Sequence, residues 1–226
     1  MRLLRGMRYN FGIAARERDT EGTVKSIILA IALLFVADTS QTLTQEERDR
    51  AVAELEGSKK AFLDATKGLS AAQWNFKPAP ERWSVAECSE HIALSEGYIF
   101  GLVSEKIMKA PANPEKREAA KGKDELILKM MQDRSHKATA PEPLDPAKHG
   151  PMPGADSVKL FLDNRAHTIE YVKTTQDDLR DHLFDHPVPA IGTLDGYQWI
   201  MLISGHTRRH TAQILEVKAD PNFPKM

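Results

Sequence analysis

This chain has a single cysteine, Cys88, and almost no net charge. One cysteine excludes an internal disulfide. A formal net charge of -1 gives no electrostatic footprint for nucleic acid, and we expect no nucleic-acid partner. The sequence also lacks an internal repeat, a glycine-rich phosphate-binding loop and a β-rich segment. These absences favour a helical domain.

An uninterrupted apolar run, Ile27–Ala37, follows Lys25. The run is too short to span a bilayer core of about 30 Å, but it has the length of a signal-peptide hydrophobic region. The arginine-rich stretch Met1–Thr23 is long for such a peptide, whereas a start at Val24, on a bacterial GTG codon, gives a compact one. We expect residues 1–43 to be a leader and the mature protein to be exported, periplasmic or secreted, with no stable membrane span. The alternative is a cytoplasmic protein with an N-terminal tail or anchor.

The remainder, residues 44–226, is long enough for one domain, and its apolar residues recur at the three- and four-residue steps of amphipathic helices. Pro78 and Pro80 interrupt the link that follows the first helix, and Ser84 begins a capping box with Glu87. Four helices without strands predict an all-α fold, a four-helix bundle. The predicted helices cover about residues 44–69, 84–109, 155–182 and 195–218.

A long, irregular connection, Pro111–Pro153, separates the second and third predicted helices. It is charged and proline-rich, with one short helix indicated near Asp124–Gln132. We expect it to form an excursion over the surface or over one end of the bundle. The pattern leaves the relative direction of the second and third helices open.

Two histidines, His206 and His210, lie four residues apart in the fourth predicted helix and therefore share one face. His91 falls on the inner face of the second predicted helix, where the pattern otherwise calls for an aliphatic residue. A buried imidazole needs partners for its nitrogens, and three on inner faces are hard to explain as core residues alone. Three imidazoles suit zinc, nickel or a similar divalent ion and leave a coordination position open. The alternative is a set of hydrogen-bonded core histidines.

Neighbouring polar residues have ordinary explanations too. Thr207 stands where a zincin motif has its glutamate base, so the general base and the catalytic residues stay unknown. Glu90 is predicted to lie on a solvated face. Cys88 is either a small core residue or a ligand or nucleophile. Arg165, charged on an inner face, predicts a buried ion pair, a stem packed on the core or a substrate-carboxylate site. The tryptophans are expected to be packing anchors: Trp74, Trp83 and Trp199.

Two segments resemble signatures of the DinB superfamily. Trp83–Ile92 (WSVAECSEHI) resembles its second-helix signature, and Asp195–Trp199 with Gly205–Ile214 resembles its last-helix signature. The similarity extends over about residues 44–219. The resemblance implies a bundle in up-down-down-up order. It also implies a divalent metal, often zinc or nickel, held here by His91, His206 and His210.

The same resemblance also indicates which functions to expect. Some members of the superfamily are thiol-dependent transferases or isomerases, and many are called metal-dependent hydrolases. Low-molecular-weight thiols are abundant in the cytoplasm, so export favours a metal-dependent hydrolase of a small molecule that the sequence does not name. The alternatives are a thiol-dependent transferase or isomerase and a non-enzymatic metal-binding bundle. The oligomeric state is open, and a symmetric homodimer is compatible with a bundle.

Overall fold

The computed structural model describes residues 42–135, 139–148, 150 and 152–225. The predicted leader therefore lies almost wholly outside the described residues. Within them, no helix is both long enough and apolar enough to cross a membrane. The bundle is formed by four long helices: α2 (Gln45–Thr66), α4 (Val85–Leu102), α7 (Gly154–Thr174) and α8 (Gly196–Lys218).

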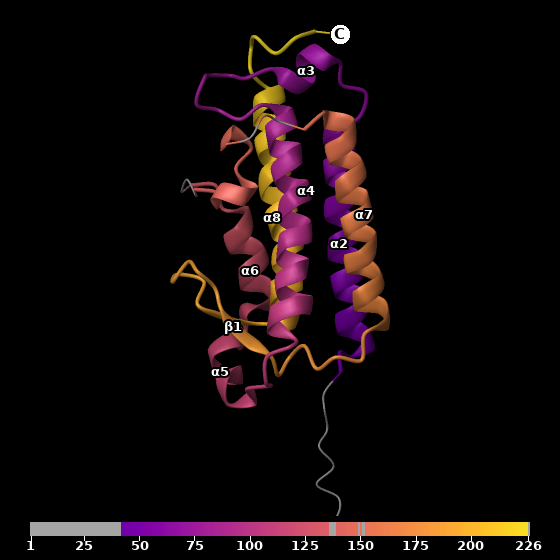
Figure 1. Ribbon diagram of the computed structural model, residues 1–226, viewed down its shortest axis with the longest axis vertical. Helices are drawn as coiled ribbons and strands as arrows, with labels where there is room; N and C mark the ends of the chain where they lie inside the picture. The colour runs from indigo at the N-terminus through magenta and orange to yellow at the C-terminus, as the bar shows by residue number, and fades with distance from the viewer. Residues whose placement is uncertain (1–41, 136–138, 149, 151, 226) are drawn as a thin grey trace, which may run out of the picture. The chain divides into compact units, whose positions relative to one another are not determined.

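The four helices form two parallel pairs (Figure 1). The starts of α2 and α8 meet where the Tyr197 hydroxyl donates to the Glu47 carbonyl, and their ends meet where Lys218 donates to the Ala65 carbonyl. Helices α4 and α7 run parallel to each other and opposite to the first pair. This is the up-down-down-up order that the resemblance implies. It requires the chain to cross back from the end of α4 to the start of α7.

Local capping starts three of the four helices. In each, a side-chain oxygen accepts from a backbone N–H three residues later, and that third residue bonds back to the cap. The box predicted at Ser84 is confirmed. The boxes of α2, α4 and α8 are Thr44 with Glu47, Ser84 with Glu87, and Asp195 with Gln198.

Two connections differ from the prediction. The link after α2 holds a short helix, α3 (Ala71–Asn75), which ends before the prolines. Helix α7 ends at Thr174 rather than near residue 182, because Thr175 is extended and its hydroxyl accepts from the Asp177 N–H in place of a helical bond. The chain then forms an antiparallel hairpin of β1 (Leu183–Asp185) and β2 (Thr193–Asp195). Strands of three residues are too short to show an alternating pattern.

The long connection packs along the bundle rather than only over one end. The π-helical turn η2 (Val103–Ile107) directly continues α4. The connection then contains the short helices η3 (Pro114–Lys116), α5 (Arg117–Ala120), α6 (Lys123–Gln132), η4 (Glu142–Leu144) and η5 (Pro146–Lys148). Helix α6, predicted near its observed place, packs against α8 and buries Ile127 and Leu128. A Cβ atom on Gly205 of α8 would lie 2.8 Å from the Cβ of Met131, so glycine permits this close approach beside His206.

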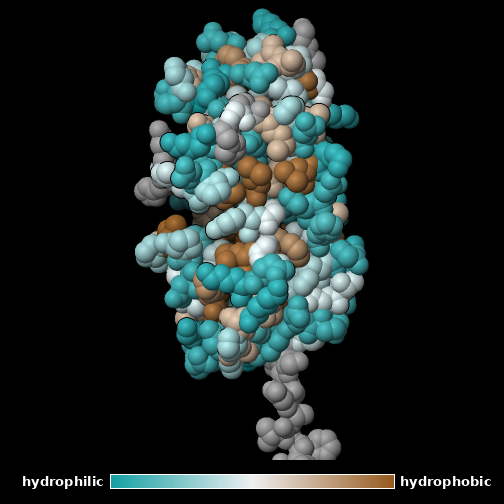
Figure 2. Space-filling view, viewed as in Figure 1, coloured by the Kyte–Doolittle hydropathy of each residue, from teal (hydrophilic) through white to brown (hydrophobic). Residues whose placement is uncertain are grey.

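The buried apolar residues form two clusters. One includes Leu55 and Ile200, and the other includes Phe62 and Phe161, whose rings meet edge to face at 4.7 Å. Arg165 contacts both clusters, through the Leu55 carbonyl and the Phe161 ring. The outer face seen in Figure 2 is largely hydrophilic, with apolar side chains gathered near its middle.

Candidate metal centre

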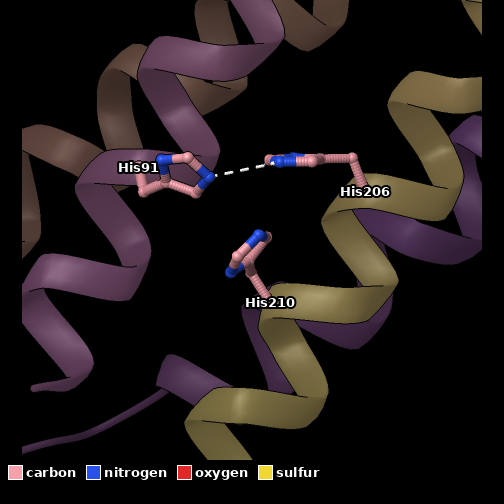
Figure 3. A group of neighbouring side chains, drawn as sticks. All are labelled: His91, His206 and His210. Carbon is pink, nitrogen blue, oxygen red and sulfur yellow. Dashed lines mark hydrogen bonds between the residues drawn. The ribbon is translucent and has the colours of Figure 1, made fainter. Parts of the chain in front are cut away.

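The three histidines singled out from the sequence converge between α4 and α8 (Figure 3). One ring nitrogen of each lies within 4.8 Å of a ring nitrogen of the other two. His91 and His210 are buried, and His206 is partly exposed. We call His91, His206 and His210 the triad. Facing inner stripes on antiparallel helices explain why residues so far apart in the chain meet here.

A backbone carbonyl fixes the protonation of His91. Its Nδ1 lies 2.7 Å from the carbonyl oxygen of Leu144, which can only accept, so Nδ1 carries the proton. The lone pair of Nε2 then faces the triad, 3.2 Å from Nε2 of His206. The carbonyl comes from η4, so the long connection reaches over α4 to orient one member of the triad.

A side-chain amide does the same for His210. Its Nδ1 lies 3.0 Å from Oε1 of Gln213, one turn further along α8. Arg134 donates to the same oxygen at 3.3 Å, which identifies it as the amide oxygen. Nδ1 of His210 is therefore the donor, and Nε2 is left for the triad. Two bonds of 2.8 Å to Glu216 hold Arg134 in place.

Burial keeps the three imidazoles neutral. Loss of solvent lowers the pKa of His91, against the hydrogen bond to Leu144 and the charge of Asp145, which raise it. The pKa values of His206 and His210 are well below the usual histidine value, first because of burial and then because of neighbouring imidazoles. Neutral imidazole is the form that binds a metal ion.

Trp83 lies against the triad, its ring centroid 4.9 Å from that of His91 and 6.0 Å from that of His210. From the sequence, Trp83 was expected only to be a packing anchor. Its place immediately before the Ser84 cap, where a hydrophobic residue packs back on the start of the helix, is the signal that could have revealed this contact. Gln213, three residues after His210, was visible in the same way. No sequence signal points to the Leu144 carbonyl, because it arrives from an irregular segment.

The other candidate residues have structural roles. Cys88 is fully buried in the apolar cluster of Phe62, and burial raises the pKa of its thiol, which fits a core residue. Arg165 forms a buried ion pair with Glu96, which was one of its predicted roles. The prediction for Glu90 was wrong: it is buried and accepts from the Met152 N–H, because the long connection returns over the start of α4.

Five histidines received no site role in the sequence analysis. His136 and His149 lie outside the described residues. His167 is exposed on α7, and His182 and His186 lie near and within the hairpin segment, with His186 stacked on Trp199. Among the described residues, only the triad forms a cluster of potential ligands.

A known protein family contains sequences similar to this chain. The sequence model of the DinB superfamily matches residues 54–214, a span that contains the whole triad. The chain belongs to the DinB superfamily. This membership agrees with the up-down-down-up order seen in the bundle.

Two Bacillus subtilis proteins are similar to this DinB-superfamily chain. YuaE, a protein of uncharacterised function, is 29% identical over 152 residues, which cover 67% of this chain and 87% of YuaE. YfiT has a solved structure that matches with a TM-score of 0.52 at 16% identity, covering 79% of this chain and 89% of YfiT. YfiT is described as a probable metal-dependent hydrolase with an unusual four-helix bundle topology. At this identity the likeness shows the fold.

Proposed function

We propose that this protein is a divalent-metal-dependent hydrolase of a small molecule, with His91, His206 and His210 as the metal ligands. The observation that carries the proposal is the convergence of three buried or partly buried neutral imidazoles on one point between two helices. The description of YfiT supports the same class of activity.

The donor set fits a borderline divalent ion. Two nitrogens on one tetrahedral zinc, each about 2.0–2.1 Å from the metal, lie about 3.3 Å apart. The Nε2 atoms of His91 and His206 are 3.2 Å apart. Three imidazoles with no thiolate or carboxylate suit zinc or nickel rather than magnesium or calcium. Three protein ligands also leave a position for water or substrate, as in catalytic sites.

When bound, a divalent ion in such a site supplies Lewis acidity and lowers the pKa of a coordinated water. The chain's own groups prepare the site for it. The Leu144 carbonyl and Gln213 hold the protons of His91 and His210 on Nδ1, which keeps both Nε2 lone pairs available. The ring of Trp83 packs near the rings of His91 and His210.

Metal content tests the proposal. Protein purified without an affinity-tag metal should contain, or take up from added zinc or nickel, about one ion per chain, measured by elemental analysis. His206→Ala should abolish this binding, whereas His167→Ala, an exposed histidine on α7, should leave it intact. Hydrolysis of a panel of small esters and amides should then depend on the added metal. Wild-type protein that binds no ion would contradict the proposal.

Location separates the hydrolase from the thiol-dependent alternative. We retain export through the Ile27–Ala37 run as part of the proposal, because the run has signal-peptide length and follows Lys25. The intact mass of the native protein from fractionated cells tests it. A cytoplasmic chain that keeps Met1 would contradict export and favour the thiol-dependent transferase.

A further inference from the structure

One buried side chain, Arg165, contacts all the other three helices of the bundle. Its Nε and Nη2 donate to the two carboxylate oxygens of Glu96 on α4, at 2.6 and 2.7 Å. Its Nη1 donates to Ser58 at 2.7 Å and to the Leu55 carbonyl, both on α2. Its Nη2 also donates to the Thr207 hydroxyl on α8 at 3.0 Å. These bonds use all five N–H donors of the guanidinium.

Stability alone does not account for this arrangement. The side chains of Arg165 and Glu96 are both 0% exposed, so both charges have lost their hydration. Such loss opposes the attraction between the charges, and well-packed apolar residues in place of a buried pair are often neutral or stabilising. What apolar packing cannot supply is direction. A bidentate ion pair with three further bonds fixes how the helices slide and rotate against one another.

The helices fixed in this way are those that carry the triad. Thr207 directly follows His206 and precedes His210 by three residues on α8. Glu96 follows His91 by five residues on α4. Arg165 therefore joins α4 to α8 about one turn from the triad. Ligand nitrogens have to be held within about 0.5 Å of their working geometry, so the register of α8 on α4 decides whether one ion meets all three.

We propose that Arg165 and Glu96 are positioning residues for the triad, a role that rests on the proposed function. Their ion pair sets the register of α8 against α4, so that His206 and His210 meet His91 before an ion binds. Directional bonds one turn away thus prepare the three nitrogens, while the triad itself contains no charge.

The charge-free variant Arg165→Met/Glu96→Leu tests this role. Its fold should survive, because the hydroxyls left behind keep local partners: Ser58 donates to the Leu55 carbonyl and Thr207 to the Ile203 carbonyl. We expect its zinc affinity to fall at least about tenfold, the size of effect seen when groups that orient the metal ligands are removed. Cobalt bound in place of zinc should show a changed visible absorption spectrum, because the ligand geometry has changed.

Two further variants separate register from stability. Thr207→Val removes only the bond from Arg165 to α8 and should weaken zinc binding less, by about threefold. Arg180→Met is the matched control. Arg180 is also fully engaged, by Glu47, Asp124 and Asp195, at the end where α8 begins. Its loss should lower stability and leave zinc affinity unchanged.

A metal-free crystal structure of the double variant gives a readout that does not need the ion. The distance between Nε2 of His91 and Nε2 of His206, 3.2 Å here, should lengthen. An unchanged distance together with unchanged zinc affinity would overturn the positioning role. If wild-type protein binds no zinc, the proposed function fails by itself, and the distance in the variant still decides whether the pair sets the register. Should the double variant not fold, Thr207→Val decides the question through the same two measurements.

Discussion

Two arginines tie the helices of this bundle together, and their surroundings differ. Arg165, in the middle of the bundle, is fully buried and meets one carboxylate, that of Glu96. Neutral oxygens accept its remaining protons. Arg180, at the end where α8 begins, has a side chain that is 20% exposed and meets three carboxylates.

The surroundings of the two arginines differ in net charge, and the site without net charge is the one near the triad. One positive and one negative group cancel at Arg165, so neutral imidazoles lie beside a pair with no net charge. The far cluster has an excess of negative charge that partial exposure makes tolerable. There, burial raises the pKa of Asp195 to about 6 and the charge of Asp124 adds to the rise, although Arg180 opposes it. In the middle of the bundle the buried pair fixes the geometry of the helices. At the end where α8 begins, solvent stabilises the excess negative charge.

The largest effect is expected from breaking the buried pair on one side only. Arg165→Met leaves the Glu96 carboxylate without its counter-ion at 0% exposure. The free energy of unfolding should fall by about 3–5 kcal/mol, measured by urea denaturation. Arg165→Met/Glu96→Leu should recover most of that loss. Equal destabilisation in both variants would show that an unpaired charge is not the cause.

The next effect concerns the triad, which we expect to influence metal binding far more than folding. His210→Ala removes one of three ligands and should weaken zinc binding at least about a hundredfold, more than the loss of a group that only orients a ligand does. The bundle should remain folded, because its apolar clusters do not depend on this imidazole. Zinc titration and thermal unfolding measure the two quantities. Metal content equal to that of the wild type would make His210 a core residue.

A smaller effect is expected at the far arginine. Arg180→Met should lower the free energy of unfolding by about 2–3 kcal/mol, because three carboxylates lose a shared counter-ion that is partly in solvent. Added salt should reduce this loss by screening the remaining repulsion, whereas the loss in Arg165→Met should hardly respond to salt. Urea denaturation at low and high salt checks both. The same salt response in the two variants would remove the distinction between the clusters.

The smallest effect is a pH dependence at Asp195. Its pKa is raised from 3.8 to about 6 in the folded protein, so the folded state binds this proton more tightly than the unfolded state. The resulting stabilisation is complete below about pH 4 and is lost as pH rises through about 6. Asp195→Asn removes this titration. The stability of wild type relative to Asp195→Asn should therefore fall by about 2 kcal/mol between pH 4 and pH 7, with no such trend if Asp195 titrates normally.

What the sequence predicts well here is local. The capping box at Ser84 and the four-residue spacing of His206 and His210 are properties of single helices, and both are present in the structure. The inner faces of α4 and α8 followed from helical periodicity, so their histidines could be placed toward one another. The direction of the helices came only from the resemblance, since spacing within a helix carries no information on how helices are joined.

The contacts that the sequence did not predict are made by residues of the long connection. Glu90 was expected in solvent, yet Met152 covers it. Leu144 supplies a backbone carbonyl to His91, and every residue type has a carbonyl, so no side chain signals the contact. Arg134, which follows α6, also comes from the long connection, and its side chain donates to Gln213 on α8. Irregular chain finds its place through tertiary packing, for which a single sequence has no periodic signal.

The parallel pairing of α2 with α8 has a consequence for how the protein folds. Helical bundles usually fold quickly because most of their contacts are between neighbours in the sequence. Here the bond from Ser204 to the Glu54 carbonyl joins residues 150 positions apart, and the bond from Lys218 to Ala65 joins residues 153 apart. Closing such long loops is slow, so we expect refolding to be slower than for an up-down-up-down bundle of the same length. His91 and His206 are also far apart in the sequence, by 115 positions, so we expect the triad to come together late in folding.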